Sequence, residues 1–137
     1  MVASEIERAD DPTLLRNPPL TDALQTQDMA AIAFALRHGP TVVPLASGAP
    51  DADRSEDDRP EPWVYRASPT DEPVLLLFSD ARFRPPAVPA AAGSGSPAWL
   101  RAYLDAHASE IGAVFLDFAG PHPLRATPAD LIAALDA

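Results

Sequence analysis

Cysteine is absent from this 137-residue sequence, and so are long apolar runs. Without cysteine, no disulfide, thiol nucleophile or thiolate metal site can form. No apolar stretch reaches the roughly 18 residues of a membrane span, and the N-terminus lacks the basic start and apolar core of a secretory signal. We therefore expect a cytoplasmic, single-domain protein with no membrane partner.

Lysine is absent as well, so all 10 basic residues are arginine, against 20 acidic residues and a net charge of −10. Nucleic acids and anionic membranes are bound mainly by cationic side chains that displace counterions. This charge balance therefore predicts no nucleic-acid partner. It leaves two interpretations open, namely a basic protein partner or a charge that only keeps the protein in solution.

Two short apolar runs organise the chain. Residues 74–78 form an uninterrupted run of large apolar side chains between Pro73 and Ser79, and residues 111–118 form the other run. Runs of this length without polar alternation are typical of strands that are covered on both faces. We expect the two runs to lie side by side in the middle of one sheet.

Three segments carry helix start signals. The capping residues are Asp28, Ser96 and Thr127, and proline follows Ser96 and Thr127 at the first helical position. The helix after Asp28 places its apolar residues on one stripe, and Gly39 ends it.

The remaining strand signals complete the fold class. Residues 41–45 predict a strand, and Pro44 indicates an edge position. Alternation at residues 63–67, followed by the run at 73–79, predicts a β-hairpin with a loop of about five residues. We expect an α+β single domain with a small mixed β-sheet of about four to five strands, packed by three to four helices.

Two segments are expected to lie outside this fold. Residues 1–19 are polar and acidic and contain three prolines, which predicts a flexible acidic tail before a domain at 20–137. Residues 46–62 contain six acids, Asp57 and Asp58 among them, which predicts an exposed loop whose charges repel one another. Within the domain, Gly93-Ser94-Gly95-Ser96 lacks the lysine and spacing of a phosphate-binding loop and is interpreted as a flexible linker.

Read in order, these segments resemble the N-terminal domain of the SseB family, named from type III secretion and enhanced serine sensitivity proteins. The matching pieces span residues 17–136 and are Leu20-Thr21-Asp22-Ala23-Leu24, a helix ending at Leu36, Val42-Val43-Pro44-Leu45, residues 74–80, residues 111–121, and a terminal helix with Pro128 and Leu131. Phe78-Ser79-Asp80 stands where the family has a Phe-Thr-Ser turn, and residues 117–121 replace an Asn-Pro element. The resemblance implies an α+β accessory or interaction module, and it carries over no catalytic residues.

The residues that could perform chemistry form no recognisable constellation. Ser79 lacks the Gly-x-Ser-x-Gly frame of a nucleophile elbow and is interpreted as a turn serine or helix cap. A zinc site would require the three histidines to converge; they are His38, His107 and His122. Asp117 and Glu110 are expected to lie too far apart to act as an acid/base pair. We expect no catalytic residue, no cofactor and no metal site.

Surface recognition is the function we favour. Phe83 lies between Arg82 and Arg84 in the loop directly after the run at 74–78. Loops at strand ends often bind partners, and arginine and aromatic residues are enriched at interface hot spots. Together with Asp57 and Asp58, these three are the candidate protein-interaction residues.

The leading hypothesis is therefore a non-enzymatic interaction or accessory module whose partner is another protein. Two alternatives remain open. One is an immunity-like acidic inhibitor of a basic toxin or nuclease, suggested by the net charge of −10. The other is a small hydrolase or metal-dependent enzyme that uses Ser79, Asp80 or the histidines.

Overall fold

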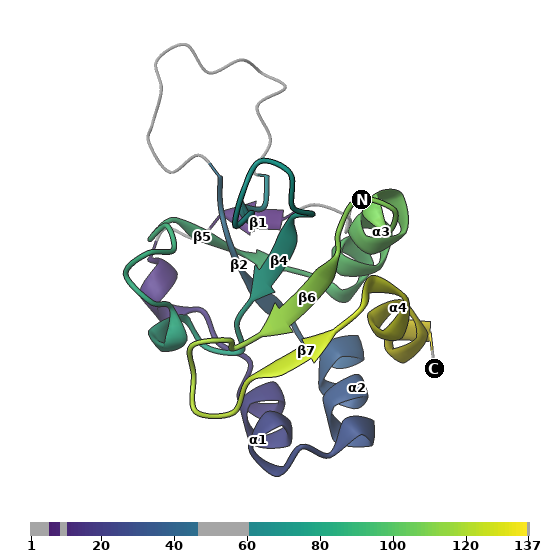
Figure 1. Ribbon diagram of the computed structural model, residues 1–137. Coiled ribbons are helices and arrows are strands. Elements are labelled where there is room, and N and C mark those ends of the chain that lie inside the picture. The colour runs from purple at the N-terminus through teal and green to yellow at the C-terminus, as the bar shows by residue number, and fades with distance from the viewer. Residues whose placement is uncertain (1–5, 9–10, 47–60, 137) are drawn as a thin grey trace.

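The computed structural model describes residues 6–8, 11–46 and 61–136 (Figure 1). These residues form an α+β single domain with two β-sheets, four α-helices and two short 3₁₀ helices. None of the described helices is long and apolar enough to cross a membrane.

The four-stranded sheet contains the two apolar runs. Its order is β3 (Val64–Tyr65), β4 (Val74–Leu77), β6 (Ala113–Leu116) and β7 (Leu124–Ala126). The inner strands β4 and β6 are parallel, and both outer strands are antiparallel to their neighbours. The prediction that the two runs pair in the middle of a mixed sheet is confirmed. The hairpin of β3 and β4 is also present, with a loop at residues 66–73 that is longer than expected.

A second sheet has three antiparallel strands in the order β1 (Ile6–Arg8), β5 (Ala92–Gly95) and β2 (Thr41–Pro44). The strands thus divide between two sheets, where the sequence predicted one. A single antiparallel bridge joins the sheets, because Val42 and Phe78 exchange backbone hydrogen bonds of 2.9 and 3.0 Å. Pro44 lies in an edge strand of its sheet, as predicted.

The central strand β5 is the segment interpreted from sequence as a flexible linker, and that interpretation is wrong. Both of its glycines are buried. A Cβ at Gly93 would lie 2.5 Å from Ile6 Cγ2, and one at Gly95 would lie 2.8 Å from the Trp99 ring. Glycine therefore permits β1 and the following helix to approach this strand closely.

The described residues form four α-helices: α1 (Pro18–Thr26), α2 (Met29–His38), α3 (Pro97–His107) and α4 (Pro128–Asp136). The Asp28 carboxylate accepts hydrogen bonds from Ala30 N and Ala31 N, and Ser96 Oγ accepts one from Trp99 N. All three predicted capping residues are confirmed, because Thr127 Oγ1 also accepts from Asp130 N at 3.0 Å. Each cap satisfies amides that have no partner within the helix.

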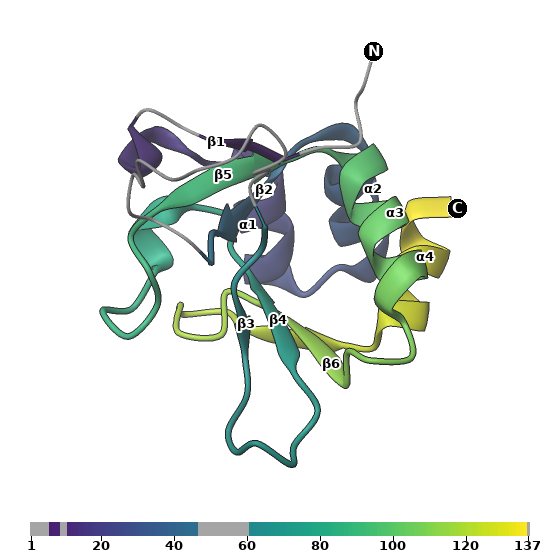
Figure 2. The ribbon, with the colours of Figure 1, turned by 90° about the horizontal axis from the view of Figure 1, so that it is seen from above.

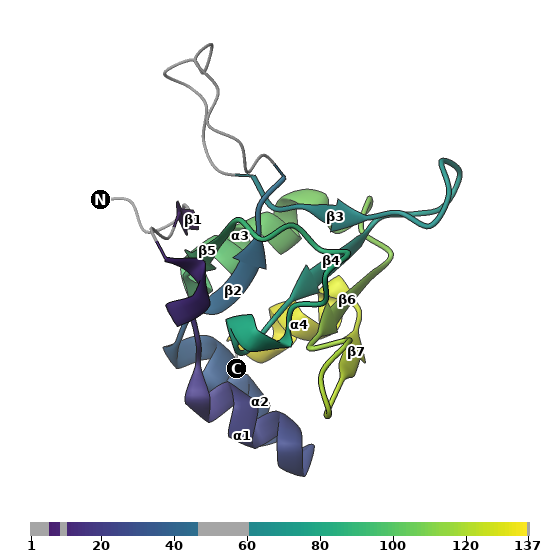
Figure 3. The same cartoon turned by 90° about the vertical axis from the view of Figure 1, so that its left-hand side faces the viewer.

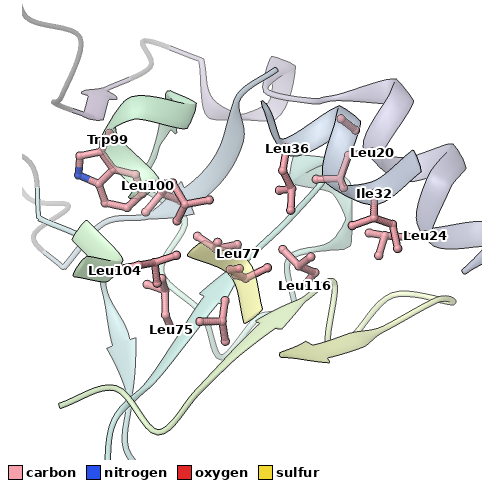
Figure 4. Close-up of a cluster of buried hydrophobic side chains, with 14 of the residues drawn as sticks. Leu20, Leu24, Ile32, Leu36, Leu75, Leu77, Trp99, Leu100, Leu104 and Leu116 are labelled. Atoms are coloured by element: carbon pink, nitrogen blue, oxygen red, sulfur yellow. The ribbon is translucent and has the colours of Figure 1, made fainter. Parts of the chain in front are cut away.

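The helices cover one face of the four-stranded sheet. Leu75 and Leu77 of β4 and Leu116 of β6 point into a core that includes residues of all four helices, among them Leu20, Leu36, Leu100 and Leu131 (Figures 2 and 4). The alternate residues Leu76 and Phe78 belong to a second, smaller cluster that contains no residue of α1–α4. It is completed by residues such as Val88 from the segment after β4.

The described part of the N-terminal segment differs from the expected flexible tail. Ile6 is buried, and its strand β1 pairs with β5. Residues Pro12–Leu14 form the 3₁₀ helix η1. Asn17 is also buried: its Oδ1 accepts from Leu20 N at the start of α1, while its Nδ2 donates to Pro40 O at 2.9 Å. These contacts integrate the segment into the domain.

The acidic loop at 46–62 falls mostly outside the described residues. Its two ends are described and lie together, because Ala46 N donates a 2.9 Å hydrogen bond to Glu61 O, and Trp63 N donates one of 2.8 Å to Pro44 O. Asp57 and Asp58, predicted as interaction residues, lie outside the described residues.

Candidate functional site

A buried polar cluster, here called the Ser79–Asp117 cluster, lies where the parallel strands β4 and β6 end. Ser79 N and Ser79 Oγ donate hydrogen bonds of 2.7 and 2.6 Å to the two carboxylate oxygens of Asp117. Thr21 Oγ1 of α1 donates to Ser79 Oγ at 2.8 Å. The main chain of Ser79 is held as well, because Asn17 N donates to Ser79 O at 2.6 Å. The cluster thus connects the ends of β4 and β6 to α1.

Burial disfavours the charged form of the carboxylate in this cluster. Asp117 is 2 % exposed and Ser79 is 0 % exposed. Burial raises the pKa of Asp117 above its usual range, the hydrogen bonds from Ser79 oppose that shift, and the nearby charge of Asp80 adds to it. Asp117 also has a φ of 54°, in the left-handed region that few non-glycine residues adopt. Strain and desolvation at one residue mark it as a position that the fold needs for a specific contact.

The chemistry that this cluster can perform is limited by access. The Ser79 hydroxyl donates to Asp117 and has no exposed surface, so a substrate cannot contact it in this conformation. The interpretation of Ser79 as a turn residue fits this geometry, although its role is to connect two strand ends rather than to cap a helix.

A cleft of about 280 Å³ opens beside Asp117. Its lining includes Phe83, Gln25 and His122. His122 is the only one of the three histidines among the lining residues of this cleft.

The other histidines are engaged elsewhere. The His38 ring lies 4.2 Å from that of Phe34, and His107 Nδ1 lies 2.9 Å from Glu110 Oε1. Within the described parts of the chain, no three histidine, aspartate or glutamate side chains gather as a metal site would require.

The predicted interaction residues Arg82, Phe83 and Arg84 differ in exposure and in the contacts that they make. They lie in and after the 3₁₀ helix η2 (Ala81–Phe83). The side chain of Arg82 is 71 % exposed, with Nε 3.3 Å from Asp80 Oδ2 and the guanidinium 5.1 Å from the Phe83 ring centre. Phe83 is half-buried against the smaller core cluster.

Arg84 has a structural task. Its Nη1 donates to Val88 O at 2.6 Å and to Pro85 O at 3.2 Å, which fixes the segment that follows. Of the three predicted residues, Arg82 therefore presents the most available side chain.

Arg82 and Arg84 line one concavity, here called the arginine hollow. It has a volume of about 410 Å³. Its remaining lining comes from η1, β2, η2, the residue after β4 and the segment before and within β5: Thr13, Val42, Pro44, Phe78, Ala81, Pro89, Ala90 and Ala92. Apart from Thr13 and the two arginines, every lining residue is apolar.

A second concavity, here called the aromatic groove, lies on the sheet face opposite the helices. It has a volume of about 460 Å³ and is lined by Trp63, Tyr65, Val74, Leu76, Ala87, Val88, Phe115 and Phe118. Tyr65 is 47 % exposed and Phe118 is 37 % exposed. The guanidinium of Arg125 on β7 lies 5.9 Å from the Phe115 ring centre, so a positive charge stands beside the groove.

Sequence reasoning missed this groove. The alternation at residues 63–67 indicated which strand face is apolar, but the run at 111–118 was expected to be covered on both faces. Only the three-dimensional arrangement reveals that the aromatic side chains of β3 and β6 share an uncovered face.

Comparison of the chain with protein-family models, with curated proteins and with solved structures finds no match.

Proposed function

We propose that this chain is a non-enzymatic protein-interaction module, resembling the SseB N-terminal domain, that binds another protein through the aromatic groove. The observation that supports this proposal is the open apolar face of the four-stranded sheet, where four aromatic side chains line one concavity of about 460 Å³. We place the module in the cytoplasm, in line with its lack of cysteine.

Aromatic side chains are suited to this role. They bury large areas with few rotatable bonds, and they dominate the energetics of many protein interfaces. Tyr65 and Phe118 are exposed in the free chain, so a partner that covers them removes apolar surface from water. The half-buried Trp63 and Phe115 supply a preformed floor.

The positive charge of Arg125 indicates which kind of partner segment the aromatic groove would bind. Arg125 stands beside Phe115, and a guanidinium next to an apolar surface favours a carboxylate over a cation. The occupant we propose is a short partner segment that places aromatic or aliphatic side chains in the groove and an aspartate or glutamate on Arg125.

The test uses a displayed peptide library selected on the full chain. The groove variant carries Tyr65→Ser and Phe118→Ser, and the control is Phe34→Ser, which removes a still more exposed aromatic ring from α2. Recovered peptides should combine apolar and acidic residues. The groove variant should weaken their binding at least about tenfold, because hot-spot truncations cost about 2 kcal/mol or more.

Two results would contradict the proposal. One is recovery of peptides that bind the groove variant and the wild type equally. The other is loss of binding in Phe34→Ser alone. Circular dichroism and urea unfolding of all variants separate lost binding from lost folding.

The two alternative functions have less support. The acidic inhibitor rests on the net charge and on Asp57 and Asp58, which lie outside the described residues. The hydrolase would need Ser79 to reach a substrate, and its side chain has no exposed surface.

A further inference from the structure

The arginine hollow is separate from the aromatic groove, since the two concavities share no lining residue. Its lining includes residues of η1 (dark purple), η2 (teal) and β2, three elements that lie on the side facing the viewer in Figure 3. The two 3₁₀ helices also contact each other.

The floor of the hollow is apolar and rigid. Val42, Phe78 and Ala92 are all buried, and they come from strands that are tied together by the Val42–Phe78 bridge and by the pairing of β2 with β5. A volume of about 410 Å³ lies within the range of small-molecule sites. Such sites combine a mostly apolar wall with a few polar groups that fix the ligand's orientation.

The polar groups here are two guanidinium groups. Arg84 is held in place by its hydrogen bonds to Val88 O and Pro85 O. Arg82 is exposed, and its Nε–Oδ2 distance of 3.3 Å to Asp80 is longer than that of a strong charge-assisted hydrogen bond. Asp80 therefore neutralises this pair of positive charges only in part.

From these observations we propose that the arginine hollow binds a small amphipathic monocarboxylate. The unbranched or aromatic apolar body lies along Ala81, Pro89 and Ala90, which keep exposed surface above the buried floor, and the carboxylate accepts hydrogen bonds from Arg82 and Arg84. Guanidinium matches the two oxygens of a carboxylate in geometry as well as charge. The apolar floor supplies affinity that a bare anion would lack.

Binding competes with one existing contact. A carboxylate on Arg82 must displace or share the Asp80 carboxylate. Asp80 also caps η2, because its Oδ1 accepts from Arg82 N at 2.9 Å. Asparagine caps a helix as well as aspartate does. Asp80→Asn should therefore keep the loop intact and tighten ligand binding about twofold, the scale of an exposed ion pair.

The experiment is isothermal titration calorimetry of the full chain with sodium butanoate, hexanoate and octanoate. Saturable binding is expected, with each added methylene tightening it about threefold to fourfold. Octan-1-ol, which has the same body without the charge, should bind at least about tenfold more weakly than octanoate. Inorganic phosphate, which has charge without the body, should show no saturation over the same range.

Three substitutions test whether octanoate binds in the arginine hollow. Arg82→Gln should weaken octanoate binding about tenfold, and it should keep the fold because the Arg82 side chain is exposed. Ala90→Phe, at an exposed wall position, should fill the hollow and abolish binding. Arg125→Gln serves as the matched control, because it removes the same charge beside the aromatic groove and should leave octanoate binding unchanged.

Three outcomes overturn the proposal: no saturable binding of octanoate, equal binding of octanoate and octan-1-ol, or weakening by Arg125→Gln in place of Arg82→Gln. The last result would place the ligand in the aromatic groove. The Phe118 ring lies 6.1 Å from the ring of Phe78, so the separating variant is Tyr65→Ser alone. It should leave octanoate binding unchanged, which makes failure of this proposal distinguishable from failure of the proposed function.

Discussion

Two substitutions at Asp117 separate the contribution of its hydrogen bonds from that of its charge. Alanine removes both carboxylate acceptors. The buried Ser79 N–H, which now donates to Asp117 Oδ1 at 2.7 Å, then loses its hydrogen-bond partner. A buried donor without a partner costs about 1–3 kcal/mol, and the Ser79 hydroxyl must also rearrange. Alanine in the left-handed conformation adds to this, since φ is 54° here. We expect Asp117→Ala to lower the free energy of unfolding by about 3 kcal/mol.

Asparagine should behave differently. Its Oδ1 keeps the hydrogen bond from Ser79 N, and its Nδ2 can donate to Ser79 Oγ, which then donates to Thr21 Oγ1. Asparagine also tolerates the left-handed conformation well. Asp117→Asn should therefore change the free energy of unfolding by less than about 1 kcal/mol at neutral pH.

The pH dependence supplies the sharper comparison. Burial raises the pKa of Asp117 in the folded chain above the ordinary value of 3.8. Between that ordinary value and the raised one, the folded state binds more protons at this site than the unfolded state does. Stability contributed by Asp117 therefore falls as pH rises through this window, and it is fully present only below the unfolded value. Relative to Asp117→Asn, which does not titrate, the wild type should gain stability as pH falls.

Urea unfolding of both proteins, from about pH 4 to about pH 8, measures this difference. All other acids are common to the two proteins, so their titration cancels in the difference. A constant difference, or a wild type that loses stability relative to Asp117→Asn as pH falls, would refute the reasoning from burial.

Two further predictions concern stability: one tests the close packing at Gly93, and the other tests the hydrogen bonds of Asn17. Gly93→Ala places a Cβ 2.7 Å from Glu7 O, so it should destabilise the chain by about 1–3 kcal/mol in urea unfolding, whereas Gly120→Ala, with its nearest neighbours at 3.4 Å, should stay within about 0.5 kcal/mol. Asn17→Ala removes the α1 cap and the donor to Pro40 O and should cost about 2–4 kcal/mol; Asn17→Ser should recover about 1 kcal/mol of it, and equal losses in both variants would mean that the cap contributes nothing.

The features that the sequence predicted well are those that depend on neighbouring residues. The run at 74–78 identifies β4 because five large apolar side chains in a row can only be buried on both faces of a strand or in a core helix. Asp28 and Ser96 identify helix starts because a short polar side chain can satisfy the amides two or three positions later.

Contacts between distant segments could not be predicted in this way. Gly93 and Gly95 have the composition of a linker, and their role as a close-packed strand depends on Ile6, which approaches from β1, and on how Trp99 of the following helix folds back onto Gly95. The bonding of Ser79 to Asp117 depends on the parallel register of β4 and β6. The open face that carries Phe115 depends on which side the helices cover.

The hydrogen bond between Ala46 and Glu61 has a consequence for how this protein can vary. Because residues 46 and 61 are hydrogen-bonded to each other, the number of residues between these two positions is independent of the distance that they must span. Lengthening a closed loop costs only about 0.6 kcal/mol for each doubling. Related chains can therefore gain, lose or exchange sequence at this point while the strands on either side keep their register.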